Sequence, residues 1–337
     1  MLELMNENDF DNVYKIMEDS FPPDEHRTYE EQKALLNKAN YNIYVAKSGC
    51  AEEIQGFMAV WQFEDLTFIE HFAVDKTFRN SGLGSRMLRS IRELVKERIC
   101  LEVELPYTDI AKKRISFYER NGFTYNGYQY IQPAISRGRN PIPLRIMTTE
   151  GCLREGEFTA IKNVLYKDVY GVEADYTEQL FDIKLIRQED NSRIEDIIRS
   201  CLIEYGGNHE GTAWTDSDLG RFFEIYNRDG NAYWVATDQI GKVVAGVGIG
   251  ELEGLQNVCE LQKMYSLPEV RGLGVAEKLL EVALEYAKGY YNKCYLETLD
   301  NMIRAQKFYE KHGFCRINEP LLETGHFCCD VRYMKEL

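Results

Sequence analysis

The sequence contains no run of apolar residues long enough to cross a bilayer, so we expect no membrane-spanning helix and no membrane partner. Its first residues, 1–7, lack the basic and then apolar build of a secretory signal, and we therefore expect a cytoplasmic protein. Low-complexity tracts are missing too. A length of 337 residues suits two domains better than a single core.

Positive charge is in deficit, with 40 Lys and Arg against 55 Asp and Glu and a formal net charge of −15. Binding to nucleic acid rests largely on Lys and Arg neutralising phosphates, so we expect no nucleic-acid partner. An acidic surface could steer a cationic acceptor toward the protein. It also keeps a protein in solution whatever it binds, and solubility explains the charge without any partner.

Metal-binding cysteine patterns are missing as well. The chain has nine cysteines but no Cys-x-x-Cys pair, and the adjacent Cys328 and Cys329 have no partners at ligand spacing. We expect reduced thiols and no metal site. No cysteine accompanies a His–acid pair in the two motif regions described next, which disfavours a covalent enzyme intermediate.

The stretch from Phe68 to Val95 is the feature around which the chain is organised. An apolar strand, Phe68–Val74, leads through a turn into Arg79-Asn80-Ser81-Gly82-Leu83-Gly84, where a helix begins. The helix is indicated by apolar residues at three- and four-residue spacing: Leu83, Met87, Leu88, Ile91, Leu94 and Val95. The first N–H groups of a helix lack internal partners and its dipole is positive there, so such a loop can hold phosphate.

A second copy of this plan occupies Glu260–Ala287, with the loop Arg271-Gly272-Leu273-Gly274-Val275-Ala276. Arg271 follows Arg79 by 192 positions. A downstream motif, Phe117–Phe123, is repeated at Phe308–Phe314, 191 positions later. Because two separate motifs recur at nearly one offset, the sequence predicts a tandem duplication.

These paired signatures resemble the GNAT superfamily of acyl-CoA-dependent N-acetyltransferases. The resemblance covers both halves and rests on Arg-x-x-Gly-x-(Gly/Ala) with a later tyrosine in each. It implies two α+β domains, each with a mixed sheet and helices on both faces. We expect an N-terminal domain at 1–150, a helical linker at 151–181 and a C-terminal domain at 182–337.

The resemblance implies that acetyl-CoA lies on the two loops and on the strand ends before them. The residues expected to bind it are Phe72, Ala73, Val74, Arg79, Asn80, Ser81, Gly82, Leu83, Gly84 and Ser85 in the first half, and Met264, Tyr265, Ser266, Arg271, Gly272, Leu273, Gly274, Val275, Ala276 and Asn301 in the second. The first half has Ile110 near the position of Asn301, which departs from the family pattern. A dinucleotide-binding fold is disfavoured because neither loop has the full Gly-x-Gly-x-x-Gly fingerprint.

Catalysis in the family pattern requires a donor to the leaving thiolate and a base for the acceptor amine. Tyr118 and Tyr309 are the expected donors, since a phenol within hydrogen-bond reach can protonate a thiolate. Glu70 and Glu260 are the expected bases, with His71 as the runner-up to Glu70. Strand alternation should turn Glu70 and His71 to opposite faces, so that only one faces the cleft.

We therefore expect an N-acetyltransferase that transfers an acetyl group directly to a primary amine of a small molecule. Loops that carry acceptor specificity are expected at residues 20–27 and 205–209, with Tyr128, Tyr130 and Trp214 nearby. One alternative is that one half is a non-catalytic acyl-CoA-binding or scaffold domain. Another is a transferase that takes its acyl group from aminoacyl-tRNA, which the acidic balance disfavours.

Overall fold

A computed structural model describes residues 2–49, 53–252, 254–321 and 328–337. The chain divides into two compact units, Met1–Tyr176 and Thr177–Leu337, each with its own sheet. Within the described residues, no helix is both long and apolar enough to cross a membrane.

The first unit is built on a mixed sheet of eight strands among its described residues, in the order β1-β2-β3-β4-β5-β8-β6, with β7 also paired to β8. Neighbouring strands are antiparallel except for β4 and β5, which are parallel. The strands are β1 (Leu2–Leu4), β2 (Tyr41–Lys47), β3 (Ile54–Gln62), β4 (Leu66–Val74), β5 (Arg98–Glu104), β6 (Thr124–Tyr125), β7 (Tyr130–Gln132) and β8 (Ile142–Thr148).

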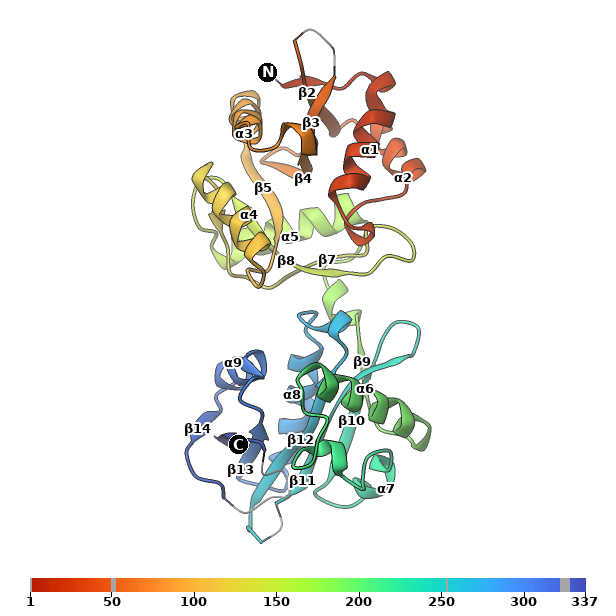
Figure 1. Cartoon of the computed structure of the whole chain (residues 1–337), viewed down its shortest axis with the longest axis vertical. Helices are drawn as coiled ribbons and strands as arrows, with labels where there is room; N and C mark the ends of the chain where they lie inside the picture. The colour runs from red at the N-terminus through yellow and green to blue at the C-terminus, as the bar shows by residue number, and fades with distance from the viewer. Residues whose placement is uncertain (1, 50–52, 253, 322–327) are drawn as a thin grey trace. The chain divides into compact units, whose positions relative to one another are not determined.

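Helices cover both faces of this sheet, as predicted (Figure 1). The helices α1 (Phe10–Ser20), α2 (Tyr29–Ala34) and α5 (Glu155–Val164) pack on one face, and α3 (Leu83–Leu94) and α4 (Asp109–Arg120) pack on the other. Successive residues of β3 accordingly belong to different cores, because side chains alternate across a strand. Helix α2 begins with a capping box, in which Thr28 and Glu31 are bonded reciprocally.

The second unit repeats this architecture with seven described strands in the order β14-β15-β13-β12-β11-β10-β9. Its one parallel pair among the described strands, β12 with β13, corresponds to β4 with β5. The elements are β9 (Asp182–Leu185), α6 (Asn191–Glu204), α7 (Phe222–Ile225), β10 (Ala232–Thr237), β11 (Val243–Glu251), β12 (Val258–Ser266), α8 (Val275–Ala287), β13 (Lys293–Thr298), α9 (Ile303–Lys311), β14 (Cys315–Ile317) and β15 (Val331–Glu336). The structure thus agrees with the predicted duplication and fold class.

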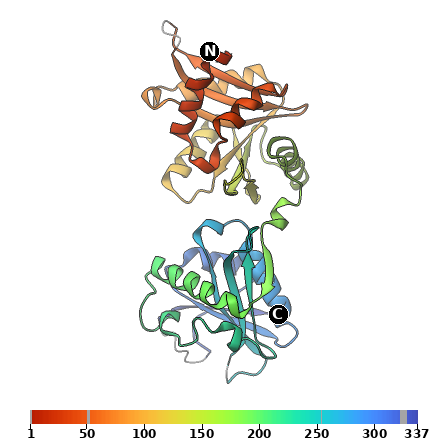
Figure 2. The ribbon, with the colours of Figure 1, turned by 90° about the vertical axis from the view of Figure 1, so that its right-hand side faces the viewer.

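Opposite faces of the second sheet are also covered by helices. Tyr233 of β10 stacks on Phe222 of α7, with ring centroids 4.9 Å apart, while its neighbour Trp234 contacts Tyr286 of α8 at 5.2 Å. Adjacent strand residues point to opposite faces, so α7 and α8 lie on different sides. Figure 2 shows α1 in front of the first sheet and α6 in front of the second.

The segment expected as a linker, 151–181, is for the most part integral to the first unit, which extends to Tyr176. Helix α5 continues as a π-helical segment, Leu165–Tyr170, and ends at Gly171 in the left-handed conformation. Phe158, Ile161 and Leu165 pack in the same core as α1. Their three- and four-residue spacing gives this segment an apolar face that the sheet buries.

Residues 216–227 contain only the single helical turn α7. Gly220 within this stretch is left-handed, with a φ of 81°, which interrupts a helix.

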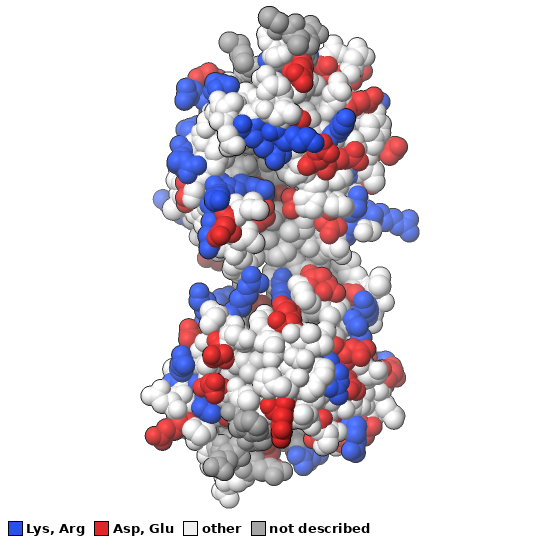
Figure 3. Space-filling view, in the orientation of Figure 1, with Lys and Arg blue, Asp and Glu red and all other residues white. Residues whose placement is uncertain are grey.

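On the face of the chain drawn in Figure 3, Lys and Arg side chains are interspersed with Asp and Glu across each unit.

Candidate active site

The candidate site of the first unit begins where β4 and β5 separate. Their parallel pairing runs from Leu66 opposite Arg98 to Ile69 opposite Leu101 and ends there. Beyond that point β4 continues along β3, and β5 continues along β8. The two strands therefore diverge, and a pocket of about 570 Å³ is lined by residues from both diverging ends.

The glycine loop forms one side of this pocket. Asn80 and Gly82 are left-handed, with φ of 63° and 74°, and α3 begins at the next residue. The N–H of Arg86 donates to the carbonyl of Gly82 at 3.2 Å, which starts the helical ladder, so the N–H groups before it face out of the helix end. A Cβ on Gly84 would lie 3.3 Å from the Phe117 ring, so glycine keeps this close approach open.

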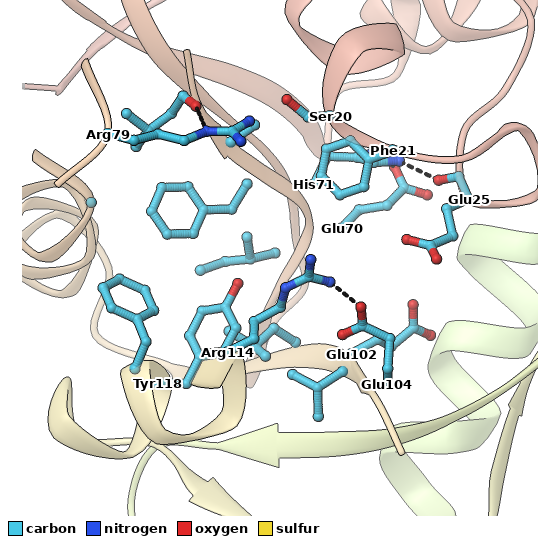
Figure 4. A pocket seen from close by; sticks show the side chains of 18 of the residues that line it. Ser20, Phe21, Glu25, Glu70, His71, Arg79, Glu102, Glu104, Arg114 and Tyr118 are labelled. Carbon is cyan, nitrogen blue, oxygen red and sulfur yellow. Dashed lines mark hydrogen bonds and ion pairs between the residues drawn. The ribbon is translucent and has the colours of Figure 1, made fainter. Parts of the chain in front are cut away.

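Arg79 fixes the loop to the end of β4. Its Nε donates to the carbonyl oxygen of Val74 at 3.0 Å (Figure 4). Among the described residues, no carboxylate pairs with its guanidinium group. Together with the positive end of α3, whose first turn has no acidic residue, Arg79 makes this side of the pocket suited to an anion.

Tyr118 approaches the pocket from α4. Its ring contacts Phe72 of β4 and Phe123, with centroids 6.5 and 5.8 Å away, and Figure 4 shows its hydroxyl group pointing into the cavity. Burial raises the pKa of Tyr118 to about 12. The phenol is therefore neutral, and a hydrogen-bond donor, across the physiological pH range.

Glu70 lies in the pocket wall with both carboxylate oxygens engaged. Its Oε1 is 2.6 Å from Arg27 Nη1, and its Oε2 accepts a hydrogen bond from Trp61 Nε1 at 3.0 Å. Burial opposes ionisation of this carboxyl, but Arg27 and His71 outweigh it and lower the pKa of Glu70. A carboxylate with both oxygens bonded is a weak base. Glu70 is therefore better suited to hold β4 in place than to accept a proton.

The expectation that Glu70 and His71 face opposite ways is wrong, since both line the pocket. Val60 pairs with Ile69 and Ala59 with His71, so Glu70 is an extra residue in β4, a β-bulge. The bulge breaks the alternation on which the expectation relied. The Nε2 of His71 is 2.8 Å from the backbone oxygen of Glu25, and burial lowers the pKa of His71.

Three further carboxylates face the pocket from the loop after α1 and from β5: Glu25, Glu102 and Glu104. Glu104 is paired with Arg114, and Glu102 accepts hydrogen bonds from the hydroxyl groups of Tyr130 and Tyr170. Burial, with repulsion from Glu104, raises the pKa of Glu25 to about 7. Burial, with repulsion from Glu70 and Glu25, also raises the pKa of Glu102 to about 7.

The second unit has the same loop geometry but smaller cavities, one of which, of about 330 Å³, is lined by residues of α7, β11 and the first half of β12. Gly272 and Gly274 are left-handed, and Arg271 Nε donates to the carbonyl of Ser266 at 3.2 Å, as Arg79 does to Val74. The cavity between the diverging ends of β12 and β13 measures about 90 Å³. Met264, Tyr265 and Tyr309 line it, but residues 271–276, all of them described, do not.

The charged and polar groups of the second unit are paired differently. Arg271 donates from Nη1 and Nη2 to the two carboxylate oxygens of Glu204, at 2.6 and 2.7 Å. The hydroxyl of Tyr309 lies 3.9 Å from the sulfur of Met264, and burial raises the pKa of Tyr309. Glu260 accepts a hydrogen bond from Gln262 Nε2 at 2.6 Å.

Comparison with known proteins agrees with the two-unit architecture. Residues 39–125 match the model of the acetyltransferase (GNAT) domain, and residues 192–314 match that of the acetyltransferase (GNAT) family. An uncharacterized N-acetyltransferase of Escherichia coli is 41% identical over 152 residues, which are 44% of this chain and 90% of that protein. The chain belongs to the GNAT acetyltransferase family.

Other GNAT relatives are more distant. An uncharacterized N-acetyltransferase of Archaeoglobus fulgidus is 29% identical over 106 residues, covering 30% of this chain and 72% of that protein. A solved structure of a GNAT-family protein from Bacteroides thetaiotaomicron has 31% identity and a TM-score of 0.48, and covers 51% of this chain and 99% of that one. With two GNAT units, the chain is a tandem acyltransferase.

The first GNAT unit brings its predicted residues together. The 570 Å³ pocket is lined by the loop from Arg79 to Ser85, except for Ser81, and by Glu70, Phe72, Ala73, Val74 and Tyr118. Ser81 instead donates from Oγ to the carbonyl of Phe78 at 2.7 Å.

The second GNAT unit brings fewer of its predicted residues together. Its 90 Å³ cavity is lined by Glu260, Met264, Tyr265 and Tyr309, but not by the loop residues 271–276. Asn301 is outside that lining and donates to the backbone oxygen of Tyr205 at 2.7 Å.

Sequence reasoning missed Glu102 and Glu104 in the GNAT pocket, and it placed Glu25 only within the expected acceptor loop, 20–27, without naming it as a base. Glu102 and Glu104 alternate with Leu101 and Val103 on β5, so the sequence pattern itself places them on one face of a strand whose other face is apolar. No periodic signal singles out Glu25 within that loop, where it ends a short 3-10 turn, Pro23–Glu25. No group of three or more metal-ligating side chains is found in the described ranges.

Proposed function

We propose that the first unit transfers an acetyl group from acetyl-CoA directly to a primary amine of a small-molecule acceptor. The observation that carries the proposal is that a single pocket of about 570 Å³ is lined by the helix-opening loop, the free end of β4 and Tyr118. An acyl-CoA bound there would supply the acyl group as a thioester. All other roles fall to side chains and backbone groups of this chain.

The loop is suited to hold the coenzyme's diphosphate. The outward N–H groups at the start of α3 offer donors, and so does the guanidinium of Arg79, whose positive charge no described carboxylate pairs with. Gly84 leaves room for close approach. Tyr118 would donate a hydrogen bond to the sulfur as it leaves. With a pKa of about 12, its phenol is a weaker acid than a thiol near 8.5, so it stabilises the thiolate by hydrogen bonding.

Glu25 is the base that we favour for the acceptor ammonium. Among the described residues its carboxylate has no hydrogen-bond or ion-pair partner, and its backbone oxygen is 2.8 Å from His71 Nε2, next to the bulge of β4. A pKa of about 7 matches a base that works near neutral pH. Glu70, the base expected from the sequence, is already engaged by Arg27 and Trp61.

The test is release of free thiol from acetyl-CoA by the full chain, measured against a panel of primary amines. We expect turnover with at least one amine and a loss of kcat of about 100-fold in Tyr118→Phe. The matched variant Tyr309→Phe should retain activity. If acetyl-CoA does not bind at millimolar concentration, or if no amine supports thiol release, the proposal fails.

We further propose that the second unit has a structural role, with neither turnover nor strong coenzyme binding. This is supported by its two cavities, of about 90 and 330 Å³, neither of which is lined by the loop residues 271–276, and by the carboxylate of Glu204 against Arg271. Titration calorimetry with acetyl-CoA tests it. Equal turnover by a chain that carries Tyr118→Phe would contradict it.

A further inference from the structure

The inner end of the first pocket contains polar groups that the proposed reaction does not use. In Figure 4, Arg79 and Tyr118 lie on one side of the cavity, and the carboxylates of Glu25, Glu102 and Glu104 lie on the other. Glu102 belongs to β5 just beyond Leu101, where the strands diverge. It therefore sits at the base of the opening.

Glu102 is held in place without a cationic partner among the described residues. The hydroxyl of Tyr130 donates to Oε1, and the hydroxyl of Tyr170 donates to Oε2 at 2.8 Å. These two hydrogen bonds orient the carboxylate toward the pocket that it lines. Among the described residues no Lys, Arg or His forms an ion pair with it, whereas Glu70 is paired with Arg27 and Glu104 with Arg114.

Gln132 supplies a second, independent observation. This β7 residue lines the same pocket, is only 5% exposed, and its buried Nε2 atom has no hydrogen-bond partner. Buried amides in proteins almost always find a partner, and an exception calls for an explanation. A bound molecule with polar groups at this end of the pocket provides one.

The wall is built from one face of the sheet. Glu104 of β5 and Tyr130 of β7 are both paired with Leu144 of β8, and Gln132 follows Tyr130 by two residues. Side chains two residues apart on a strand share a face, so Gln132 and Glu104 project to the side on which Glu102 also lies. The carboxylate and the amide can thus contact different parts of one ligand.

On the basis of the function proposed above, we propose that the acceptor is a primary amine bearing a second positive charge, which Glu102 and Gln132 bind at the inner end of the pocket. The Glu102 carboxylate accepts hydrogen bonds from an ammonium group. Gln132 Nε2 donates, so as placed it would contact a hydroxyl or a neutral amine of the ligand, and after a half-turn of the amide its oxygen would accept from an ammonium group. An acceptor with a carboxylate in that position would meet Glu102 and Glu104 and be repelled. The class includes linear diamines and amino sugars with several amines.

The test compares acceptors of matched length with the full chain: 1-aminobutane, 1,4-diaminobutane and 4-aminobutanoate, with an amino sugar carrying several amines as a fourth. We expect kcat/KM for the diamine or the amino sugar to exceed that of the monoamine by about tenfold or more. 4-Aminobutanoate should be the poorest. If the diamine has the higher kcat/KM, the second charge comes from a linear amine; if the amino sugar has the higher kcat/KM, it comes from a sugar amine.

Glu102→Gln should reduce the ratio of kcat/KM for the charged acceptor to that for the monoamine by about tenfold, mainly through KM. Gln132→Ala should reduce the ratio in the same direction. Glu119→Gln, the same change at an exposed position of α4, should leave the ratio unaltered. Acetyl-CoA binding measured by calorimetry shows that each variant is folded.

Thiol release with the monoamine at a rate equal to the diamine and the amino sugar would overturn the inference while leaving the proposed function intact. A preference for 4-aminobutanoate would overturn it as well. Absence of thiol release with every amine would instead contradict the proposed function itself. The two failures are therefore distinguishable in one assay.

Discussion

Arg271 is bound by both carboxylate oxygens of Glu204, whereas Arg79, at the equivalent position of the first unit, has no carboxylate partner among the described residues. Both arginines make the same Nε bond to the end of the preceding strand. The two loops therefore differ in the charge that they present to a diphosphate. A carboxylate against Arg271 cancels the charge that an anion would need.

This difference predicts the stoichiometry of coenzyme binding. Calorimetric titration of the full chain with acetyl-CoA should give one site, weakened about tenfold or more by Arg79→Ala and unchanged by Arg271→Ala. Removing the charge in Glu204→Gln should strengthen binding to the second unit. Two equal sites in the unaltered chain would contradict this account.

The role of Glu25 predicts a pH dependence. A base acts only when it is deprotonated, so a carboxyl with its pKa raised to about 7 should make kcat/KM fall as the pH drops below 7. With 1-aminobutane as the acceptor, which offers Glu102 no second charge, Glu25→Gln should lower kcat/KM by about 100-fold and remove that limb of the pH profile. The limb set by the acceptor amine, which titrates near pH 10, should remain.

Glu70→Gln serves as the comparison for the base assignment. If Glu70 fixes the strand, this variant should keep the limb near pH 7 even where its activity is reduced. Loss of that limb in Glu70→Gln, with its retention in Glu25→Gln, would return the role of base to Glu70.

The ion pair of Arg27 and Glu70 predicts a stability effect. Both side chains are nearly buried, at 7% and 2% exposed, so removing one partner leaves an uncompensated charge in the interior. Glu70→Gln should lower the free energy of unfolding of the first unit by about 3–5 kcal/mol, measured by urea denaturation. The double variant Arg27→Met with Glu70→Leu should lose less unfolding free energy than Arg27→Met alone or Glu70→Leu alone, because it leaves no unpaired charge in the interior.

The same pair gives stability a dependence on pH. The pKa of Glu70 is lowered in the folded protein, so its contribution is present above its unfolded pKa, near 4.3, and is lost as the pH falls through the lower folded value. Acid denaturation of Glu70→Gln should therefore show a weaker dependence on pH in this range than that of the unaltered chain.

Local features of the site could be predicted from the sequence because they depend on local chemistry. The loops at Gly82 and Gly274 follow from residues that tolerate left-handed backbone and from the apolar spacing of the next helix. The two repeated motifs also identify which residues of the two units correspond to each other. Strand alternation, by contrast, assumes a regular strand, and the bulge at Glu70 breaks that assumption.

Long-range features could not be predicted in this way. The pairing of Glu70 with Arg27 joins residues 43 positions apart, and that of Arg271 with Glu204 joins residues 67 apart. Neither contact leaves a periodic signal. The size of each cavity likewise depends on how strands and helices pack, which explains why a loop of the same geometry lines the 570 Å³ pocket in the first unit but is absent from the lining of the 90 Å³ cavity in the second.

The π-helical turn after α5 reaches the site from outside the repeated motifs. Its Val169 carbonyl accepts a hydrogen bond from Arg27 at 3.3 Å, and its Tyr170 hydroxyl donates to Glu102. A polypeptide that stopped at residue 150 would keep every family motif of this half but lose both of these contacts. An isolated amino-terminal enzyme must therefore extend past Tyr170 to keep its arginine and its glutamate aligned.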